Sequence, residues 1–207
     1  MKPTLALLLA LLVAGCVNFG DQPDTPAVVH YVLDDTGGVS PPASPAAGGE
    51  APPAAALPTL LVLDTAVGGF YDSDQLVFSR SPGTRGQYQF ARWTERPGKR
   101  FAELMRARIE QGGRYRVAAA GGYVRGDLLL DTELVEFYHD AASAPGVVRL
   151  RLRAELVDLG RRTLLAHRVF ETEAALASYD AAGAAEASAV AVGRTLDALT
   201  VWLASVR

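Results

Sequence analysis

The most regular pattern in the chain is an alternation of apolar and charged residues over residues 147–158. The even positions from 148 to 156 are apolar, and the odd positions from 149 to 155 carry three arginines and a glutamate. A period of two is typical of a β-strand with one buried face. A turn at residues 158–161 and a β-rich run at 163–171 follow, so this part of the chain predicts a hairpin.

Further runs of β-branched and aromatic residues predict strands at 28–33, 60–67, 75–80, 87–93, 115–119 and 127–137. In the last run, alternation predicts one shared face for four residues: Asp131, Glu133, Val135 and Phe137. The two acids are then expected to pair with the arginines of the hairpin across the sheet. We interpret this as a solvated sheet face, and a phosphate-binding stripe of arginines is the alternative.

Two segments have helical periodicity. Apolar residues recur three and four positions apart between Phe101 and Ile109, which predicts a helix with Thr94 as its N-cap and an end at Gly112. Residues 180–206 have the same spacing and predict a longer helix. The elements together predict an α+β fold, with a mainly antiparallel or mixed sheet and two helices packed on one face.

The chain is expected to form a single folded domain over residues 28–207. Residues 36–58 interrupt it with six of the twelve prolines, among alanine, glycine and serine. Such a segment buries too little apolar surface to offset its ordering entropy, so we predict a disordered loop. A proline-rich docking peptide is the alternative.

The N-terminus carries an export pattern. Lys2 precedes an unbroken apolar run at residues 5–14, too short for a helix that spans a bilayer, which needs about 20 residues. The run fits a signal peptide. Residues 13–16, Val-Ala-Gly-Cys, resemble the lipobox of bacterial lipoproteins, which implies cleavage before Cys16 and a covalent lipid on its thiol. We therefore predict a lipoprotein signal peptide at 1–15 and a membrane tether at 16–27; an ordinary secretory signal is the alternative.

Composition narrows the possible partners. The formal charge of the chain is −3, and removal of Lys2 with the signal peptide takes it to −4. This mild acidic balance argues against nucleic acid as a partner. Cys16 is the only cysteine, so no disulfide is expected. Val17 follows it where an aspartate would favour the inner membrane, so by likeness to lipoproteins in general we expect an outer-membrane anchor that faces the periplasm.

Motifs of catalysis and metal binding are missing from the sequence. The three histidines, His30, His139 and His167, fall on separate predicted strands or strand ends. His139 with Asp140 is the nearest approach to a metal pair, and two adjacent residues do not make a site. We predict no enzymatic activity, no metal and no cofactor apart from the lipid on Cys16.

From Tyr31 to the C-terminus the chain resembles the ABC-type transport auxiliary lipoproteins, the PqiC/YmbA-like group. The ordered set of segments that carries the resemblance is YVL at 31–33, FYDSDQLVFSR at 70–80, YQFARW at 88–93, LDTELVEF at 130–137, RVF at 168–170 and LTVWL at 199–203. No one of these motifs is catalytic.

The resemblance implies a non-enzymatic outer-membrane lipoprotein of an ABC transport system that moves lipids between the inner and outer membranes. Its partner would be a periplasmic MCE-type (mammalian cell entry) protein with its permease and ATPase, for which the lipoprotein is a dock. Some relatives form rings, so a homo-oligomeric ring is a further expectation. The alternatives are a lipid-binding carrier that holds an acyl chain between sheet and helices, and a regulator of cell-wall synthases.

A candidate partner-binding rim follows a Gly-Gly bend past a predicted strand end. It consists of Phe70, Tyr71, Asp72, Arg80 and Arg92. The two arginines close neighbouring strands, so we predict that aromatic and guanidinium groups converge there. Tyrosine and arginine are common in binding hot spots. The alternative is that Phe70 and Tyr71 cap the core.

Overall fold

The computed structural model describes residues 26–37 and 57–206. The elements in chain order are β1 Val29–Tyr31, β2 Thr59–Val62, β3 Ala66–Val67, β4 Gln75–Ser79, β5 Gly86–Trp93, α2 Pro97–Gln111, β6 Arg116–Ala119, β7 Leu128–Asp140, β8 Val147–Asp158, β9 Thr163–Ala175 and α3 Ala181–Ser205. The predicted α+β class, with a mixed sheet and two helices, is confirmed. Cys16, the predicted signal peptide and residues 38–56 of the predicted loop lie outside the described residues.

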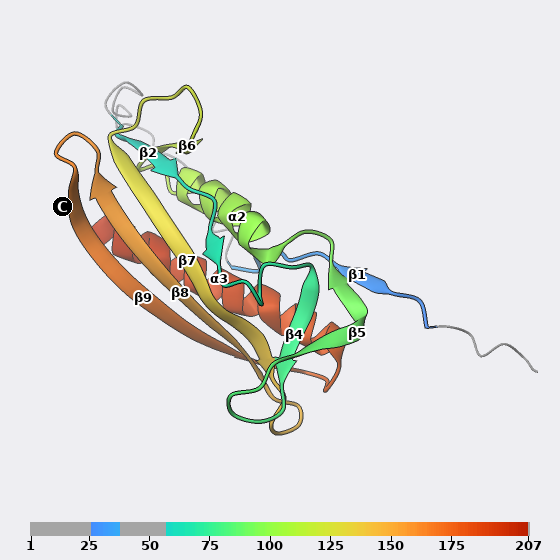
Figure 1. The fold of residues 1–207 in the computed structure, drawn as a ribbon. Coiled ribbons are helices and arrows are strands. Elements are labelled where there is room, and N and C mark those ends of the chain that lie inside the picture. The colour runs from blue at the N-terminus through green and yellow to red at the C-terminus, as the bar shows by residue number, and fades with distance from the viewer. Residues whose placement is uncertain (1–25, 38–56, 207) are drawn as a thin grey trace, which may run out of the picture.

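The long strand β7 organises the sheet (Figure 1). One of its edges pairs with β8 in antiparallel orientation, and β9 continues the sheet from β8. Its other edge pairs in succession with three short parallel strands, β2, β3 and β4. The predicted strand at 60–67 is therefore two strands, because β2 pairs at Leu128–Leu130 and β3 pairs at Glu133 and Leu134.

A β-bulge in β7 changes which side chains enter the core. Between residues 134 and 136 the register with β8 shifts, which leaves Val135 as the extra residue. A bulge moves the following residues to the opposite face. Phe137 is therefore buried and stacks on Trp93, with ring centroids 5.9 Å apart. The prediction that Phe137 shares a face with Asp131 and Glu133 is wrong for this reason.

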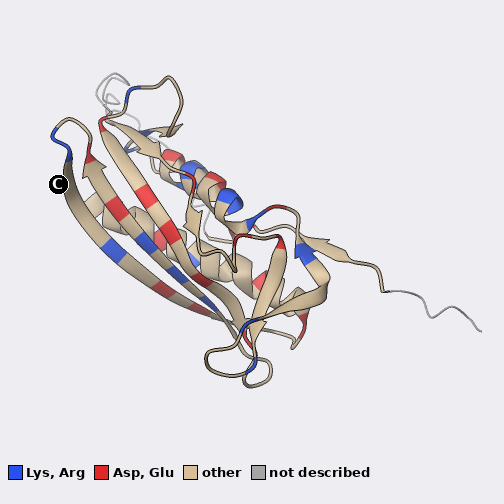
Figure 2. Cartoon of the chain, viewed as in Figure 1, with Lys and Arg blue, Asp and Glu red and all other residues tan. Residues whose placement is uncertain are grey.

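The outer face of β7, β8 and β9 is charged (Figure 2). The arginines of β8 form the pairs Arg149–Asp140, Arg149–Glu173, Arg151–Glu171 and Arg153–Glu133. The predicted pairing of Glu133 with the arginine row is confirmed, whereas Asp131 lies opposite Glu155 and not opposite an arginine. Each arginine of this row has a carboxylate partner, which favours a solvated face over a phosphate-binding stripe.

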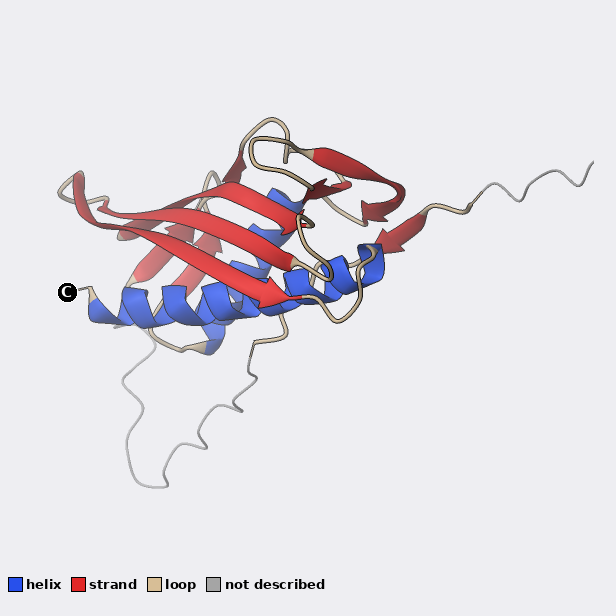
Figure 3. Cartoon of the chain, turned by 90° about the horizontal axis from the view of Figure 1, so that it is seen from below, coloured by secondary structure: helices blue, strands red, loops and turns tan. Residues whose placement is uncertain are grey.

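Both helices lie on the opposite face of the sheet (Figure 3). Helix α2 begins at Pro97 with Arg96 as its N-cap, so the prediction of Thr94 as the cap is wrong. The backbone nitrogen of Thr94 instead donates to the carbonyl of Tyr31, which continues the pairing of β1 with β5. Helix α3 begins as predicted, because the Asp180 side chain accepts a hydrogen bond from the Gly183 nitrogen at 2.8 Å.

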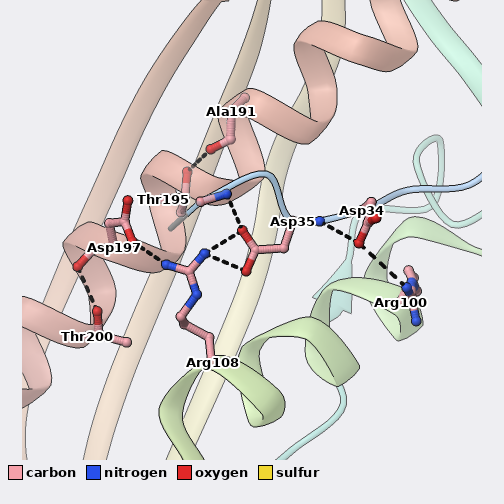
Figure 4. A network of polar contacts seen from close by, with 9 residues as sticks. Asp34, Asp35, Arg100, Arg108, Ala191, Thr195, Asp197 and Thr200 are labelled. Carbon is pink, nitrogen blue, oxygen red and sulfur yellow. Dashed lines mark hydrogen bonds and ion pairs between the residues drawn. The ribbon is translucent and has the colours of Figure 1, made fainter. Parts of the chain in front are cut away.

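The chain after β1 runs between the two helices and is held by two arginines of α2, Arg100 and Arg108 (Figure 4). Arg108 of α2 has a side chain only 9% exposed, and its Nη2 donates to both carboxylate oxygens of Asp35 at 2.6 Å. Its Nη1 pairs with Asp197 of α3. This cluster of Arg108, Asp35 and Asp197, the Arg108 clasp, joins the N-terminal segment to both helices.

The clasp requires a close backbone approach at α3. A Cβ atom at Gly193 would lie 2.5 Å from the backbone nitrogen of Gly37, so only glycine leaves room for the segment. Gly37 also donates from its backbone nitrogen to Asp35 at 2.9 Å. At the other end of the predicted loop, the Pro58 carbonyl accepts from the Arg116 nitrogen at 3.0 Å. Both ends are thus held, and disorder between them stays a prediction.

Replacing Arg108 with methionine should lower the free energy of unfolding by about 3 kcal/mol, because it leaves the largely buried Asp35 carboxylate without its partner. Arg106→Met is the matched control on the same helix. Arg106 pairs with Asp64, whose side chain is 76% exposed, so its loss should cost about 1 kcal/mol or less. Urea unfolding followed by circular dichroism measures both variants; equal losses would contradict the clasp.

Candidate partner-binding surface

The loop between β3 and β4 forms a compact turn that projects one aromatic ring. The backbone nitrogens of Tyr71 and Asp72 donate to the carbonyl of Gly68 at 2.8 and 3.1 Å. The Phe70 side chain beside them is 46% exposed and lies edge-on to the Tyr71 ring at 6.1 Å. An aromatic ring held by a rigid turn and left half in solvent suits a binding contact.

Tyr71 is fixed by an arginine that the sequence analysis did not single out. The Nε of Arg85 donates to the Tyr71 hydroxyl at 2.7 Å. The same guanidinium lies over the Tyr138 ring, 3.8 Å from its centroid, and 3.6 Å from a carboxylate oxygen of Glu136. Arg85 therefore links Tyr71 to the outer face of β7, as a cation that stacks on one tyrosine and donates a hydrogen bond to the other.

Arg80 and Arg92 lie at opposite ends of the β4–β5 pair, because Gln75 is opposite Arg92 whereas Phe78 is opposite Gly86. The guanidinium of Arg80 lies over the Phe78 ring at 5.0 Å. The predicted convergence of Arg80 and Arg92 on one rim is wrong. Whether the two arginines meet depends on the register of β4 with β5. The sequence alone does not show that several residues of β5 bulge out between its pairing with Gln75 and its pairing with Val77.

Arg92 stabilises the bulge in its own strand by hydrogen bonds to backbone carbonyls. Its Nη1 donates to the carbonyls of Tyr88 and Ala91, each at 3.0 Å. Asp72 has a different basic neighbour, since Nη1 of Arg96 lies 3.3 Å from its carboxylate, and both side chains are more than half exposed. The rim in the structure therefore consists of Phe70, Tyr71 and Asp72 with Arg85 and Arg96 as its cations.

His139 lies in an aromatic cluster near the ends of β7 and β4. Its Nε2 is 3.0 Å from the carbonyl of Pro145, and its Nδ1 is 2.8 Å from the Tyr88 hydroxyl. A carbonyl only accepts, so Nε2 carries the hydrogen and Nδ1 accepts from Tyr88. The Tyr179 ring packs edge-on at 5.6 Å. Both ring nitrogens are therefore occupied, and within residues 26–37 and 57–206 no group of three or more histidine, cysteine, aspartate or glutamate residues could hold a metal ion.

Residues 41–200 match the family of the ABC-type transport auxiliary lipoprotein component. The chain belongs to this family. Membership implies a lipid anchor in a membrane and association with an ABC-type transport system. A search among curated proteins finds no significant match. In the described part of this auxiliary lipoprotein, no helix is both long enough and apolar enough to cross a bilayer.

Solved structures share the fold of this auxiliary lipoprotein. A crystal structure of a protein from Xanthomonas campestris is similar with a TM-score of 0.69 and 20% identity, over 86% of this chain and 94% of that one. The crystal structure of an uncharacterised protein gives 0.60 and 14%, over 70% and 92%. A hypothetical protein from Chlamydia trachomatis gives 0.51 and 8%, over 70% and 95%. At these identities the likeness shows the fold alone.

Burial sets the protonation of the His139 cluster in this auxiliary lipoprotein. Desolvation lowers the pKa of His139, and its hydrogen bond to Pro145 and the nearby Asp140 only partly oppose the shift. Burial also raises the pKa of Tyr88 to about 12, so its hydroxyl stays protonated and continues to donate to Nδ1. A proton added to Nδ1 would remove that acceptor.

Acid should therefore destabilise the domain through His139. The pKa in the folded state is below the unfolded value of about 6.5, so the unfolded state binds more protons between the two values. The stability that the domain gains from neutral His139 is fully present above about pH 6.5 and declines as the pH falls toward the pKa of the folded state. Urea unfolding at pH 7.5, 6 and 5 should show a smaller decline in His139→Gln, which cannot titrate.

The nearby carboxylates act in a separate pH range. Hydrogen bonds from Arg149 to Asp140 and from Gly183 to Asp180 lower the pKa of both carboxyl groups below 3.8. The stability that these two ionised carboxylates contribute is lost only as the pH falls below about 3.8. The same pH dependence in wild type and His139→Gln between pH 7.5 and 5 would refute the assignment to His139.

Proposed function

We propose that this auxiliary lipoprotein is a non-enzymatic docking subunit of an ABC transport system that moves lipids between the inner and outer membranes. The outer membrane holds it through the lipid on Cys16, and its domain faces the periplasm. Its partner there is an MCE-type protein that works with the permease and ATPase. The observation that supports docking over lipid carriage is the small size of the cavity between α3 and the sheet in the described part of the chain.

The cavity between α3 and the sheet has no room for an acyl chain. That cavity, lined by Trp93, Phe137 and Ser188 among others, has a volume of about 10 Å³. Such a volume holds about one water molecule. Pockets for small ligands are usually about 300–1,000 Å³. This supports a protein-binding role over the alternative of a lipid carrier.

The rim at Phe70 supports a protein partner. Phe70 offers a half-exposed ring on a rigid turn, and Tyr71 behind it is fixed by Arg85. Asp72 and Arg96 add charges at the edge. An apolar centre with a polar border is the usual anatomy of a protein interface.

The tether keeps this domain near its membrane. From Cys16 to Val28 the chain reaches at most roughly 40 Å when fully extended. The described chain begins at Pro26 and enters β1 at Val29. A short tether and a folded domain at its end suit a dock that receives a longer periplasmic partner at the membrane surface.

Cys16→Ser should abolish acylation, because the lipid is attached through the thiol and the chain has no other cysteine. Cells grown with labelled palmitate should incorporate label into the wild-type chain and not into the variant, which should accumulate as uncleaved precursor in the inner membrane. Membrane fractionation of the wild-type chain tests the outer-membrane assignment. Label that still enters the Cys16→Ser chain would exclude the proposed attachment.

Phe70→Ser should weaken co-purification with the MCE-type protein at least tenfold while the melting temperature changes by less than about 3 °C, because the ring is half exposed. Val201→Ser is the control, since Val201 is 71% exposed on α3, away from the rim. Native mass measurement of both reports any ring. Retained binding in Phe70→Ser would exclude the rim; co-purification of a cell-wall synthase instead would replace the proposed partner.

A further inference from the structure

A second surface lies at the end of the domain opposite to β1. Figures 1 and 3 show the β8–β9 hairpin at the far end from β1, and Figure 1 shows the β6–β7 loop beside that hairpin. The two connections touch, because the Leu159 nitrogen donates to the Asp127 carbonyl at 3.0 Å. We call these connections, residues 120–127 and 158–164, the distal end.

The distal end exposes apolar side chains. Tyr123 has its whole side chain in solvent, and both Val124 and Leu164 are 53% exposed. Gly121 has φ of +86°, which places the tyrosine on a sharply turned loop. Tyr123 therefore adds no packing to the described part of the domain. Tyrosine is one of the residue types that are enriched in binding hot spots.

The distal end is also basic in a protein whose formal charge is −3 (Figure 2). It carries three arginines, Arg125, Arg161 and Arg162, against two acids, Asp127 and Asp158, so its formal charge is +1. Asp127 accepts a hydrogen bond from the Thr59 nitrogen at 2.7 Å, and Asp158 accepts from the Arg161 nitrogen at 2.8 Å. Within the described residues, Arg125 and Arg162 form no ion pair.

We propose that the distal end binds an acidic segment of a protein partner. Tyr123 and Val124 supply the apolar contact, and Arg125 and Arg162 pair with the carboxylates of the segment. The proposal deepens the docking role proposed above and rests on it only in requiring a protein partner. The described chain begins at Pro26, next to β1 at the opposite end, and the proposed lipid on Cys16 precedes it in the chain, which favours a protein over the headgroups of the anchoring membrane.

The test is photo-crosslinking in cells with the full, acylated chain. p-Benzoylphenylalanine replaces Tyr123, and the same group at Val201, 71% exposed on α3, is the control. The expected result is a crosslink at position 123 to one protein, with mass spectrometry placing it on a peptide of net negative charge. The control position should not crosslink to that peptide.

Charge variants then decide the role of the arginines. Arg125→Glu with Arg162→Glu should reduce the crosslink at least tenfold, whereas Arg125→Lys with Arg162→Lys should retain most of it. Circular dichroism should show all variants folded, since both side chains lie on the surface loops.

Four results would overturn the proposal. They are a crosslink to phospholipid, a crosslink to a second copy of this chain, an unchanged yield after charge reversal, and a yield at position 123 no higher than at position 201. None of these experiments uses the MCE-type protein or Phe70, so failure of the distal end and failure of the proposed function are distinguishable.

Discussion

The placement of the N-terminal segment depends on the Arg108 clasp. A guanidinium with 9% of its side chain exposed requires paired carboxylates, because an unpaired charge at that depth is costly. Asp35 and Asp197 satisfy it from the N-terminal segment and from α3. The segment that leads from the predicted anchor is thus part of the helix packing, and Arg100, which donates to the Leu33 carbonyl at 2.9 Å, holds the same segment to α2.

Strand β7 and its bulge determine which side chains of the sheet enter the core and which face outward. Strand β7 pairs along one edge with β8 for nearly its whole length, whereas its other edge is divided among β2, β3 and β4. The bulge at Val135 turns Phe137 inward onto Trp93 and leaves Glu136 and Tyr138 facing outward beneath Arg85. The bulge at this one residue therefore directs Phe137 into the core and also directs outward the side chains that hold Arg85, the partner of Tyr71.

Local patterns were enough to predict much of this fold. The alternation in β8 and the spacing in α3 predict both elements closely, because each repeats over many residues and one face of each is buried. The break between β2 and β3, the bulge in β7 and the true start of α2 were missed. These features follow from pairing with distant strands, which a single run of residues does not encode.

The candidate site shows the same limit. Phe70, Tyr71 and Asp72 stand out in the sequence as an aromatic-acidic turn after two glycines, and the structure places them together on one loop. Arg85 could not be chosen over Arg80 from sequence, since which arginine meets Tyr71 depends on how the turn after β4 folds back. Nothing in the sequence distinguishes Arg108 from the other arginines of α2, because its burial depends on where the N-terminal segment crosses the helices.

The rim and the distal end differ in how many of their charged side chains are already paired. At the rim, Asp72 and Arg96 are paired with each other and Arg85 has Tyr71 and Glu136, so the available binding energy lies in the Phe70 ring. At the distal end three arginines outnumber two aspartates, and within the described residues Arg125 and Arg162 form no ion pair, which leaves arginine charge for a partner. An apolar contact depends weakly on salt and a charged one strongly. Salt dependence of partner binding therefore distinguishes which surface dominates in this auxiliary lipoprotein.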